Sequence, residues 1–229
     1  MSSYKLKVWN KHFFIENSSG LILLDTGSPF SFHVDGVINI GESEFKVPQS
    51  AMNISIAYLK EKVGCELSGL LGMDILSQFS VWFSSPQFGN TILFSETSDV
   101  TGQCIGNNLM GCPTVNMNVN GRKGTFLFDS GAHVSYISSK FLNGQEKCGT
   151  TTDFSPLLNS DRYEVDLYYF DSSIISYNKC FNAMYAKMPS QLEMLLSQFG
   201  VDGIIGFDLI DNYRLIVCNG HTYLPPQGI

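Results

Sequence analysis

Two aspartates stand in matching surroundings in this sequence, and both follow an apolar run. The segment LILLDTGSPFSF, residues 21–32, contains Asp25, and GTFLFDSGAHVSYIS, residues 124–138, contains Asp129. A carboxylate at the end of a buried strand is costly unless it is paired, hydrogen-bonded or used in chemistry. A single Asp-Thr-Gly would indicate no more than a turn. Two copies indicate a pair of carboxyl groups, which can serve as general acid and general base.

The residues around the two aspartates also repeat. The aspartates are 104 residues apart, and the same offset aligns Gly20 with Gly124 and Ile15 with Val119. Each copy is typical of a strand, a polar turn and an apolar strand, followed by Asp-Thr-Gly or Asp-Ser-Gly. Self-similarity of this kind predicts a structural repeat.

A second pair of motifs follows in the same order. LSGLLGMDILSQFSVWF begins at Leu67 and VDGIIGFDLIDNYRLIV begins at Val201, which aligns Gly72 with Gly206. In each copy two apolar residues precede the glycine. An apolar residue, an aspartate, a short amphipathic helical pattern and an apolar strand then follow.

Two motifs, each present twice and in the same order, resemble those of the aspartic peptidases. That family has Asp-Thr/Ser-Gly at the end of a strand and a hydrophobic-hydrophobic-Gly motif later in each lobe. The resemblance covers nearly the whole chain. LLGMDIL and IIGFDLI are more similar to the retroviral-type (retropepsin-like) lobe, whereas two lobes in one chain resemble the pepsin-like arrangement. The resemblance implies an all-β, two-lobed, pseudo-twofold acid-protease-like β-barrel fold, with a short helix near each hydrophobic-hydrophobic-Gly motif.

The length and composition are compatible with such a fold. The chain has 229 residues, of which 15% are charged and 13% aromatic. This length suits two lobes of about a hundred residues each. The polar segment SETSDVTGQ, residues 95–103, lacks clear periodicity. We therefore expect an N-terminal lobe over 1–97 and a C-terminal lobe over 98–229.

The charge and hydropathy patterns exclude several classes of partner. The net charge is −7, from 14 basic and 21 acidic residues, and no basic stripe is present, so we expect no nucleic acid. No apolar run approaches the roughly 18 residues of a membrane helix, so we expect no membrane partner. The first ten residues lack the apolar core of a signal peptide. The protein is then cytoplasmic if Met1 is the native start, and secreted if a signal or pro-segment was removed.

The six cysteines show no C-x-x-C spacing, which disfavours a zinc site. We expect free, buried thiols, although the even number of cysteines leaves disulfides open.

The chemistry that the aspartate pair suggests is hydrolysis of a peptide bond. The ionised carboxyl accepts a proton from water, while the protonated carboxyl polarises the carbonyl and later supplies its proton. Like charges held close together cannot both ionise easily, so the two pKa values split and belong to the pair. Aspartic-protease carboxyl pairs are the established example of this splitting.

Four residues next to the aspartates are expected to support them. Gly27 and Gly131 allow a tight turn and bring backbone N–H groups toward the carboxylates. In aspartic peptidases the hydroxyl after each aspartate bonds across to the opposite lobe. Thr26 and Ser130 match that position.

One position differs between the two copies. Ser28 resembles the pepsin-like form, in which a hydroxyl supports the carboxylate, and Ala132 resembles the retroviral-type form. We therefore expect the two carboxylates to differ in environment.

Other polar or small residues of the repeats are assigned structural roles. Gly72 and Gly206 are expected where the chain passes under the active-site loop, because only a residue without Cβ fits a close backbone approach. Asp74 and Asp208 are expected near helix N-termini, where an acidic residue is favourable. His133 is a candidate for a substrate subsite. The remaining histidines are expected to be solvated or structural: His12, His33 and His221.

The family covers its cleft with a β-hairpin flap, and the two copies differ in length where that flap belongs. Asp25 to Asp35 spans 10 residues, whereas Asp129 to Asp171 spans 42, so the second copy has 32 more. The additional segment, residues 139–170, has a hairpin pattern with a turn at NSDR. We expect a single flap in the second lobe; the alternative is an ordinary surface loop.

Downstream, the copies again agree. VDGVINIGESEFKV, residues 34–47, and FDSSIISYNKCFNA, residues 170–183, each predict strand, turn and strand, followed by a helical pattern. Tyr163 and Tyr168 of the additional segment are candidates for substrate binding.

The sequence therefore predicts an aspartic endopeptidase that hydrolyses peptide bonds next to apolar side chains. No metal and no organic cofactor is implied. We expect a monomer, because both carboxyl groups lie on one chain. The alternative is a catalytically inactive, aspartic-protease-like peptide-binding module.

Overall fold

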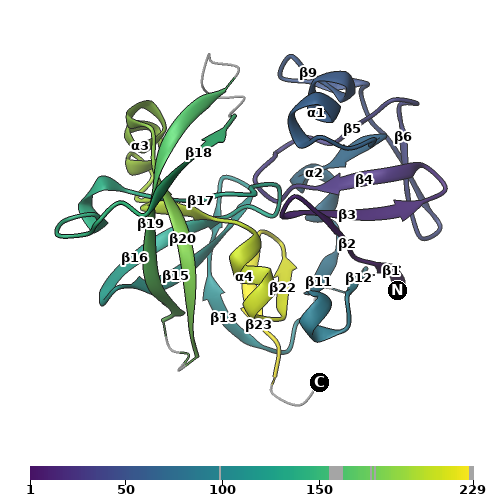
Figure 1. Ribbon diagram of the computed structural model, residues 1–229. Helices are drawn as coiled ribbons and strands as arrows, with labels where there is room; N and C mark the ends of the chain where they lie inside the picture. Colours follow the sequence, from purple (N-terminus) through teal and green to yellow (C-terminus); the bar gives the residue numbers. More distant parts are fainter. Residues whose placement is uncertain (98, 155–161, 176, 178, 227–229) are drawn as a thin grey trace.

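Strands are the main secondary structure of this protein. The computed structural model describes residues 1–97, 99–154, 162–175, 177 and 179–226. Of the described residues, 49% are in strands and 15% are helical, so the all-β class is confirmed (Figure 1). No helix among the described residues has the length and hydrophobicity needed to span a membrane.

Three sheets contain almost all of the strands. A five-stranded sheet from the first half has the order β2 (Lys7–Trp9), β3 (His12–Asn17), β4 (Gly20–Leu24), β10 (Gly69–Leu71), β5 (Phe32–His33). An eight-stranded sheet from the second half has the order β14 (Asn108–Leu109), β15 (Cys112–Val119), β16 (Arg122–Phe128), β21 (Gly203–Ile205), β17 (Ser135–Ile137), β20 (Cys180–Lys187), β19 (Tyr163–Ile174), β18 (Gly149–Asp153). A six-stranded sheet has the order β1 (Ser2–Lys5), β12 (Thr91–Ser95), β11 (Ser80–Ser84), β22 (Leu215–Cys218), β23 (His221–Leu224), β13 (Gln103–Gly106).

Short elements complete the fold. Two hairpins pair β6 (Val37–Ile40) with β7 (Ser43–Lys46) and β8 (Ser50–Ala51) with β9 (Ile54–Ser55). The helices are α1 (Ile56–Val63), α2 (Met73–Leu76), α3 (Ser190–Ser197) and α4 (Phe207–Asn212), with 3-10 turns η1 (Pro86–Phe88) and η2 (Ser139–Phe141). Helices α2 and α4 begin directly after Gly72 and Gly206, which confirms the predicted short helix at each of these motifs.

The sequence repeat corresponds to a repeat in strand pairing. β4 pairs in parallel with β10, which pairs antiparallel with β5. In the second half β16 pairs in parallel with β21, which pairs antiparallel with β17. A pairing of β15 with β19 closes part of the larger sheet into a ring of strands. Closure satisfies the edges that an open sheet would expose.

The alignment of Ile15 with Val119 is wrong. Ile15 lies opposite Ile22, whereas Val119 lies opposite Arg122 at the end of its hairpin. The residue equivalent to Ile15 is Val115, because the β15–β16 hairpin has more residue pairs than the β3–β4 hairpin. The offset of 104 residues aligns β4 with β16, the strands that lead to the aspartates, but it does not align the preceding strands, β3 and β15.

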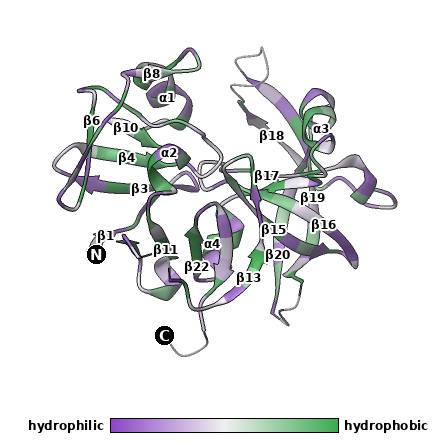
Figure 2. Ribbon diagram, turned by 180° about the vertical axis from the view of Figure 1, so that it is seen from behind, coloured by the Kyte–Doolittle hydropathy of each residue, from purple (hydrophilic) through white to green (hydrophobic). Residues whose placement is uncertain are grey.

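The two halves are joined by a shared sheet. β1, β11 and β12 precede residue 97, while β13, β22 and β23 follow residue 98, and all six belong to one sheet. At the junction β11 pairs with β22, and Phe83 lies opposite Leu215. Figure 2 shows hydrophobic residues on the strands around this junction and hydrophilic residues on many outer turns.

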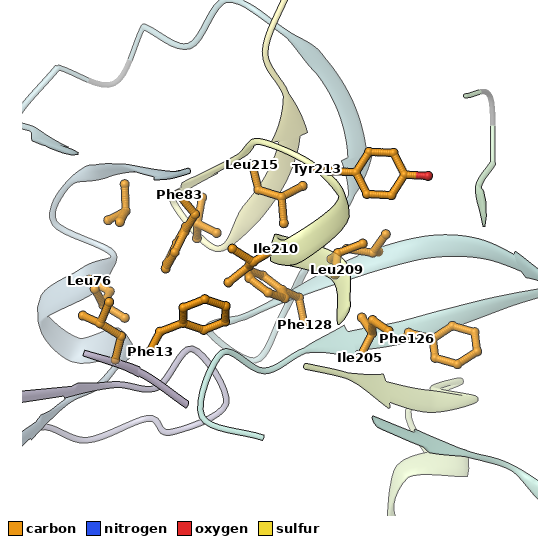
Figure 3. Close-up of a cluster of buried hydrophobic side chains, with 14 of the residues drawn as sticks. Phe13, Leu76, Phe83, Phe126, Phe128, Ile205, Leu209, Ile210, Tyr213 and Leu215 are labelled. Atoms are coloured by element: carbon orange, nitrogen blue, oxygen red, sulfur yellow. The ribbon is translucent and has the colours of Figure 1, made fainter. Parts of the chain in front are cut away.

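The largest hydrophobic core also spans both halves. Phe83 of β11 meets Phe128 of β16 edge to face, with ring centroids 5.9 Å apart. Phe13 of β3 stacks on Phe207 of α4, with centroids 5.2 Å apart. Figure 3 shows Phe13, Phe83 and Phe128 converging with Ile210 in this core.

The additional segment of the second half contains a hairpin. β18 pairs antiparallel with β19, and Asp153 lies opposite Tyr163 at the end next to the connection. Residues 155–161, which include most of the predicted turn, lie outside the described residues. The strand–turn–strand predictions are confirmed by β6 and β7 in the first half and by β19 and β20 in the second. The helical patterns after them form α1 and α3.

No disulfide links the six cysteines. The expectation of buried thiols is wrong for most of them, since only Cys218 is buried. Cys104, Cys148 and Cys180 are exposed.

We predict that the two halves unfold in one transition, because they share a sheet and a core. Leu215→Ala in β22 should lower the free energy of unfolding by about 2–5 kcal/mol, the range for removing a buried leucine side chain. Both tryptophans, Trp9 and Trp82, lie in the first half. Their fluorescence should report the same reduced urea midpoint as far-UV circular dichroism. A fluorescence midpoint that stays at the parent value would contradict this prediction.

Candidate active site

The strand pairing brings the two aspartates to equivalent positions. Asp25 follows β4 and its N–H donates to the carbonyl of Leu71, at 3.0 Å. Asp129 follows β16 and its N–H donates to the carbonyl of Ile205, also at 3.0 Å. The two side-chain carboxyl groups meet and hydrogen-bond to each other. Both residues are half-buried, so part of the pair stays open to solvent.

Backbone N–H groups surround each carboxyl group. Oδ1 of Asp25 accepts from the N–H of Gly27 at 3.0 Å and of Ser28 at 2.8 Å. Oδ1 of Asp129 accepts from the N–H of Gly131 at 2.9 Å. These donors favour the ionised form of a carboxyl group.

The expected hydroxyl support of Asp25 by Ser28 is wrong. The Ser28 hydroxyl donates to the carbonyl of Phe30 at 2.8 Å and accepts from the Phe30 N–H. It therefore closes a local turn. Ser28 contributes its backbone N–H to the carboxylate, and this group is available to any residue type at that position.

The two glycines of the motifs leave room for the opposite carboxyl group. A Cβ added to Gly27 would lie 2.4 Å from Cγ of Asp129, and one added to Gly131 would lie 2.6 Å from Cγ of Asp25. Each loop thus packs against the aspartate of the other half. Any side chain at these positions would force the carboxyl groups to move.

Thr26 and Ser130 bind the two loops together in a reciprocal set of hydrogen bonds. The Thr26 hydroxyl donates to the carbonyl of Phe128 at 2.7 Å and accepts from the N–H of Ser130 at 2.9 Å. The Ser130 hydroxyl donates to the carbonyl of Leu24 at 2.9 Å and accepts from the N–H of Thr26 at 3.0 Å. Both residues are fully buried. Water therefore cannot replace these bonds.

Gly72 and Gly206 lie under the two loops, at the close backbone approach that the sequence predicts. A Cβ on Gly72 would lie 2.5 Å from the carbonyl oxygen of Phe30. A Cβ on Gly206 would lie 2.1 Å from the carbonyl oxygen of Ala132. Ala132 thus provides a backbone surface against which the motif glycine packs.

Two serines that the sequence analysis missed support these glycines. Ser31 and Ser135 are buried, and each hydroxyl accepts from the N–H of its glycine, at 2.8 and 3.2 Å. Each hydroxyl also donates to an aspartate in the first turn of the following helix, Asp74 or Asp208. Both serines occur six residues after a motif aspartate, a repeat that could have revealed them.

The electrostatics of the carboxyl pair favour retention of a proton. Burial raises the pKa of Asp25 well above its usual value, and the neighbouring Asp129 raises it further. Burial also raises the pKa of Asp129, while the N–H of Gly131 opposes the shift. Two carboxyl groups this close share one proton over a range in which isolated carboxyl groups are ionised.

A polar cluster that the sequence did not predict lies beside the Asp129 loop. His12 is buried, and its Nδ1 lies 2.7 Å from the carbonyl oxygen of Gly131. The ring of His133 lies against it, with centroids 5.3 Å apart. His133 Nδ1 in turn lies 3.4 Å from Oδ1 of Asp153, at the end of β18. His12 therefore has one of the two roles expected for it, a structural one, although the sequence does not indicate its partner.

The two candidate tyrosines lie in different places. The Tyr163 hydroxyl is 3.0 Å from that of Tyr136, which donates to Asp153. Tyr168 packs instead against the main core. Of the two, Tyr163 is thus joined to the residues around the Asp129 loop.

His33 is buried and bonded to the carbonyl of Ser19, which is a structural role.

No group of three or more histidine, cysteine, aspartate or glutamate side chains within the described residues could hold a metal ion. Comparison of the chain with models of known protein families and with curated protein sequences gives no match.

We predict that Thr26→Val lowers the free energy of unfolding by about 2–4 kcal/mol, because it leaves a buried carbonyl and a buried N–H without partners. Thr26→Ser keeps the hydroxyl and should retain most of the stability. The matched control is Thr222→Val. Thr222 is also fully buried, but its hydroxyl has no partner among the described residues, so this variant should be as stable as the parent or slightly more so. Equal losses from both valine variants in urea unfolding would contradict the role of the reciprocal bonds.

We predict that Asp25→Asn gains stability relative to the parent as the pH rises. Raised pKa values mean that the folded pair binds more protons than the unfolded chain above the ordinary carboxyl pKa of 3.8. The parent therefore loses stability from about pH 4 upward, until the pair has released its shared proton. The slope for one proton is at most about 1.4 kcal/mol per pH unit. Urea unfolding of both proteins at a series of pH values measures the difference, and a difference that shrinks with rising pH would contradict the prediction.

Proposed function

We propose that the protein is an aspartic endopeptidase with a two-lobed, pseudo-twofold acid-protease-like fold. The observation that supports this most strongly is the hydrogen-bonded pair of Asp25 and Asp129, held half-buried by two crossed loops. A structural turn would need one carboxylate and no partner. Bringing two carboxyl groups together is electrostatically costly, and it is expected where their shared proton is used.

The proposed mechanism uses the pair as acid and base to one water molecule. The ionised carboxyl takes a proton from the water molecule while the water oxygen attacks the peptide carbonyl carbon. The protonated carboxyl donates to the carbonyl oxygen, and a proton then passes to the leaving nitrogen as the C–N bond breaks. The N–H groups of Gly27, Ser28 and Gly131 fix the orientation of the carboxyl groups during these transfers.

We propose extended peptide segments with apolar side chains as substrates. Phe30, in the loop after Asp25, is 47% exposed. Exposed aromatic side chains beside a catalytic pair offer contact surface to apolar residues of a substrate.

The β18–β19 hairpin is the proposed flap. Its end next to the connection approaches the first half, where Phe154 meets Tyr58 of α1 edge to face, with ring centroids 6.1 Å apart. In Figure 1 the hairpin and α1 lie at the same end of the molecule, in the two different halves. In the first half, the β6–β7 hairpin has Ile38 and Ile40 buried in the core, which favours a packing role for it.

A monomer is sufficient for this activity, because each half supplies one carboxyl group and each loop is held by the other half. We propose no metal and no organic cofactor, since the paired carboxyl groups supply both proton transfers.

We predict that Asp25→Asn and Asp129→Asn each lower kcat on a peptide substrate by roughly 10²–10⁴-fold or more, the size of a lost general acid–base contribution. The matched control is Asp35→Asn, which replaces an exposed aspartate outside the pair and should keep the parent kcat.

The parent should show a bell-shaped pH profile on the acid side, because one shared proton is required. Cleavage of a peptide library, read by mass spectrometry, tests all four proteins. Cleavage by the Asp25→Asn and Asp129→Asn variants at the parent rate would reject the assignment, while binding without cleavage by the parent would favour a peptide-binding module.

A further inference from the structure

His12 reaches from the first half of the chain into the loop of the second aspartate. It is 4% exposed, and its Nδ1 lies 2.7 Å from the carbonyl oxygen of Gly131. A carbonyl oxygen only accepts hydrogen bonds, so Nδ1 bears the hydrogen. The contact thus fixes the ring tautomer and anchors one peptide group of the Asp129 loop.

That peptide group also closes the turn that carries the candidate catalytic residue Asp129. The peptide plane that contains the Gly131 carbonyl contains the N–H of Ala132, which donates to the backbone carbonyl of Asp129 at 3.2 Å and also lowers the pKa of the Asp129 carboxyl. Because a peptide group is planar, its carbonyl and N–H point in opposite directions and turn together. A tilt at the His12 contact would therefore move a donor of Asp129.

On its other side His12 is connected to the hairpin. Its ring packs on that of His133, with centroids 5.3 Å apart, and His133 Nδ1 lies 3.4 Å from Oδ1 of Asp153. Asp153 is 8% exposed and also accepts from the hydroxyl of Tyr136, which lies 3.0 Å from that of Tyr163. Asp153 ends β18 and Tyr163 begins β19, so both strands of the hairpin take part.

The charges around this chain of contacts are compatible with operation in acid. Burial, with the nearby His133, lowers the pKa of His12 to about 4, so His12 stays neutral and keeps one ring N–H above that pH. Burial also lowers the pKa of His133, Asp153 opposes this shift, and Lys11 and Arg162 add to it. The remaining groups that face the cluster are the Tyr136 and Tyr163 hydroxyls, which are neutral in acid.

The equivalent place in the first half lacks this connection. Cys112 begins β15 as His12 begins β3, and its Sγ lies 3.9 Å from the carbonyl oxygen of Gly27. The ten-residue connection from Asp25 to Asp35 contains only β5, and the hairpin that follows it, β6–β7, packs into the core. Within the described residues, the Cys112 contact therefore has no counterpart of the connection through His133 to Asp153. The two candidate catalytic carboxyl groups therefore differ in what their loops are attached to.

We propose that His12, His133 and Asp153 are positioning residues that couple the seating of the β18–β19 hairpin to the alignment of Asp129. Closing the hairpin over a substrate and orienting the catalytic carboxyl are then one linked event. The catalytic consequence rests on the proposed peptidase function, whereas the structural coupling does not.

The coupling is tested in the intact protein, without substrate, by amide hydrogen exchange. Asp153→Ala should raise the exchange rate of the Gly131 and Ala132 amides, and His12→Leu should raise that of the β18–β19 amides. Coupling is reciprocal, and we expect roughly 2- to 30-fold in each direction. His12→Asn places an amide N–H near the former Nδ1 and should restore much of the protection. Cys112→Ala, the matched control, should leave the hairpin amides at the parent rate.

Exchange changes confined to the mutated element would overturn the proposal. If Asp153→Ala does not fold, Asp153→Asn and Tyr163→Phe test the same connection with smaller changes. Both should raise the exchange rate of the Ala132 amide, and an unchanged rate in both would also overturn it.

Kinetics on a hydrophobic peptide then test the catalytic consequence. Asp153→Ala and His12→Leu should each raise KM and lower kcat. The double variant should lose no more activity than the worse single variant, because both substitutions interrupt the same series of contacts. Additive losses would overturn the coupling. If the variants show the reciprocal exchange effects but the parent protein cleaves no peptide, the coupling stands and the peptidase function is rejected.

Discussion

The reciprocal hydrogen bonds of Thr26 and Ser130 are the interaction on which the rest of the site depends. Each hydroxyl donates to a carbonyl of the opposite strand end and accepts from the opposite loop. They hold two loops so close that Gly27 has no room for a side chain beside Asp129. Because both hydroxyls are buried, breaking these bonds without admitting water would leave six polar groups unpaired, namely two hydroxyls, two carbonyls and two N–H groups. The paired arrangement is therefore strongly preferred.

The shared sheet and core make this local arrangement possible. β11 and β22 align the two halves, and Phe83 and Phe128 pack where they meet. The parallel pairs β4–β10 and β16–β21 then deliver Asp25 and Asp129 to equivalent positions. Burial raises the pKa of both carboxyl groups, while loop N–H donors act in the opposite sense. The pair is thus kept near the state with one shared proton that acid–base chemistry needs.

The twofold repeat is incomplete, and the differences are concentrated around the second aspartate. The hairpin of β18 and β19, the tyrosine pair and the two histidines all lie on that side. His12 and Cys112 begin equivalent strands, and each contacts the carbonyl of a loop glycine. Only His12 also packs against a second polar side chain, the ring of His133. The repeat provides two equivalent carboxyl groups, and the longer connection in the second copy makes their surroundings unequal.

The sequence by itself determined the β class, the paired aspartates and their glycines, and the helices after Gly72 and Gly206. These depend on residue type and short spacing, which repeat openly along the chain. Tertiary structure alone decided the rest. The Ser28 hydroxyl turned to Phe30 instead of Asp25, because a local turn competed for it. His12 and Asp153 lie 141 residues apart in the sequence, yet His133 connects them. No local pattern encodes that connection, since it arises only when the first half packs against the loop of the second.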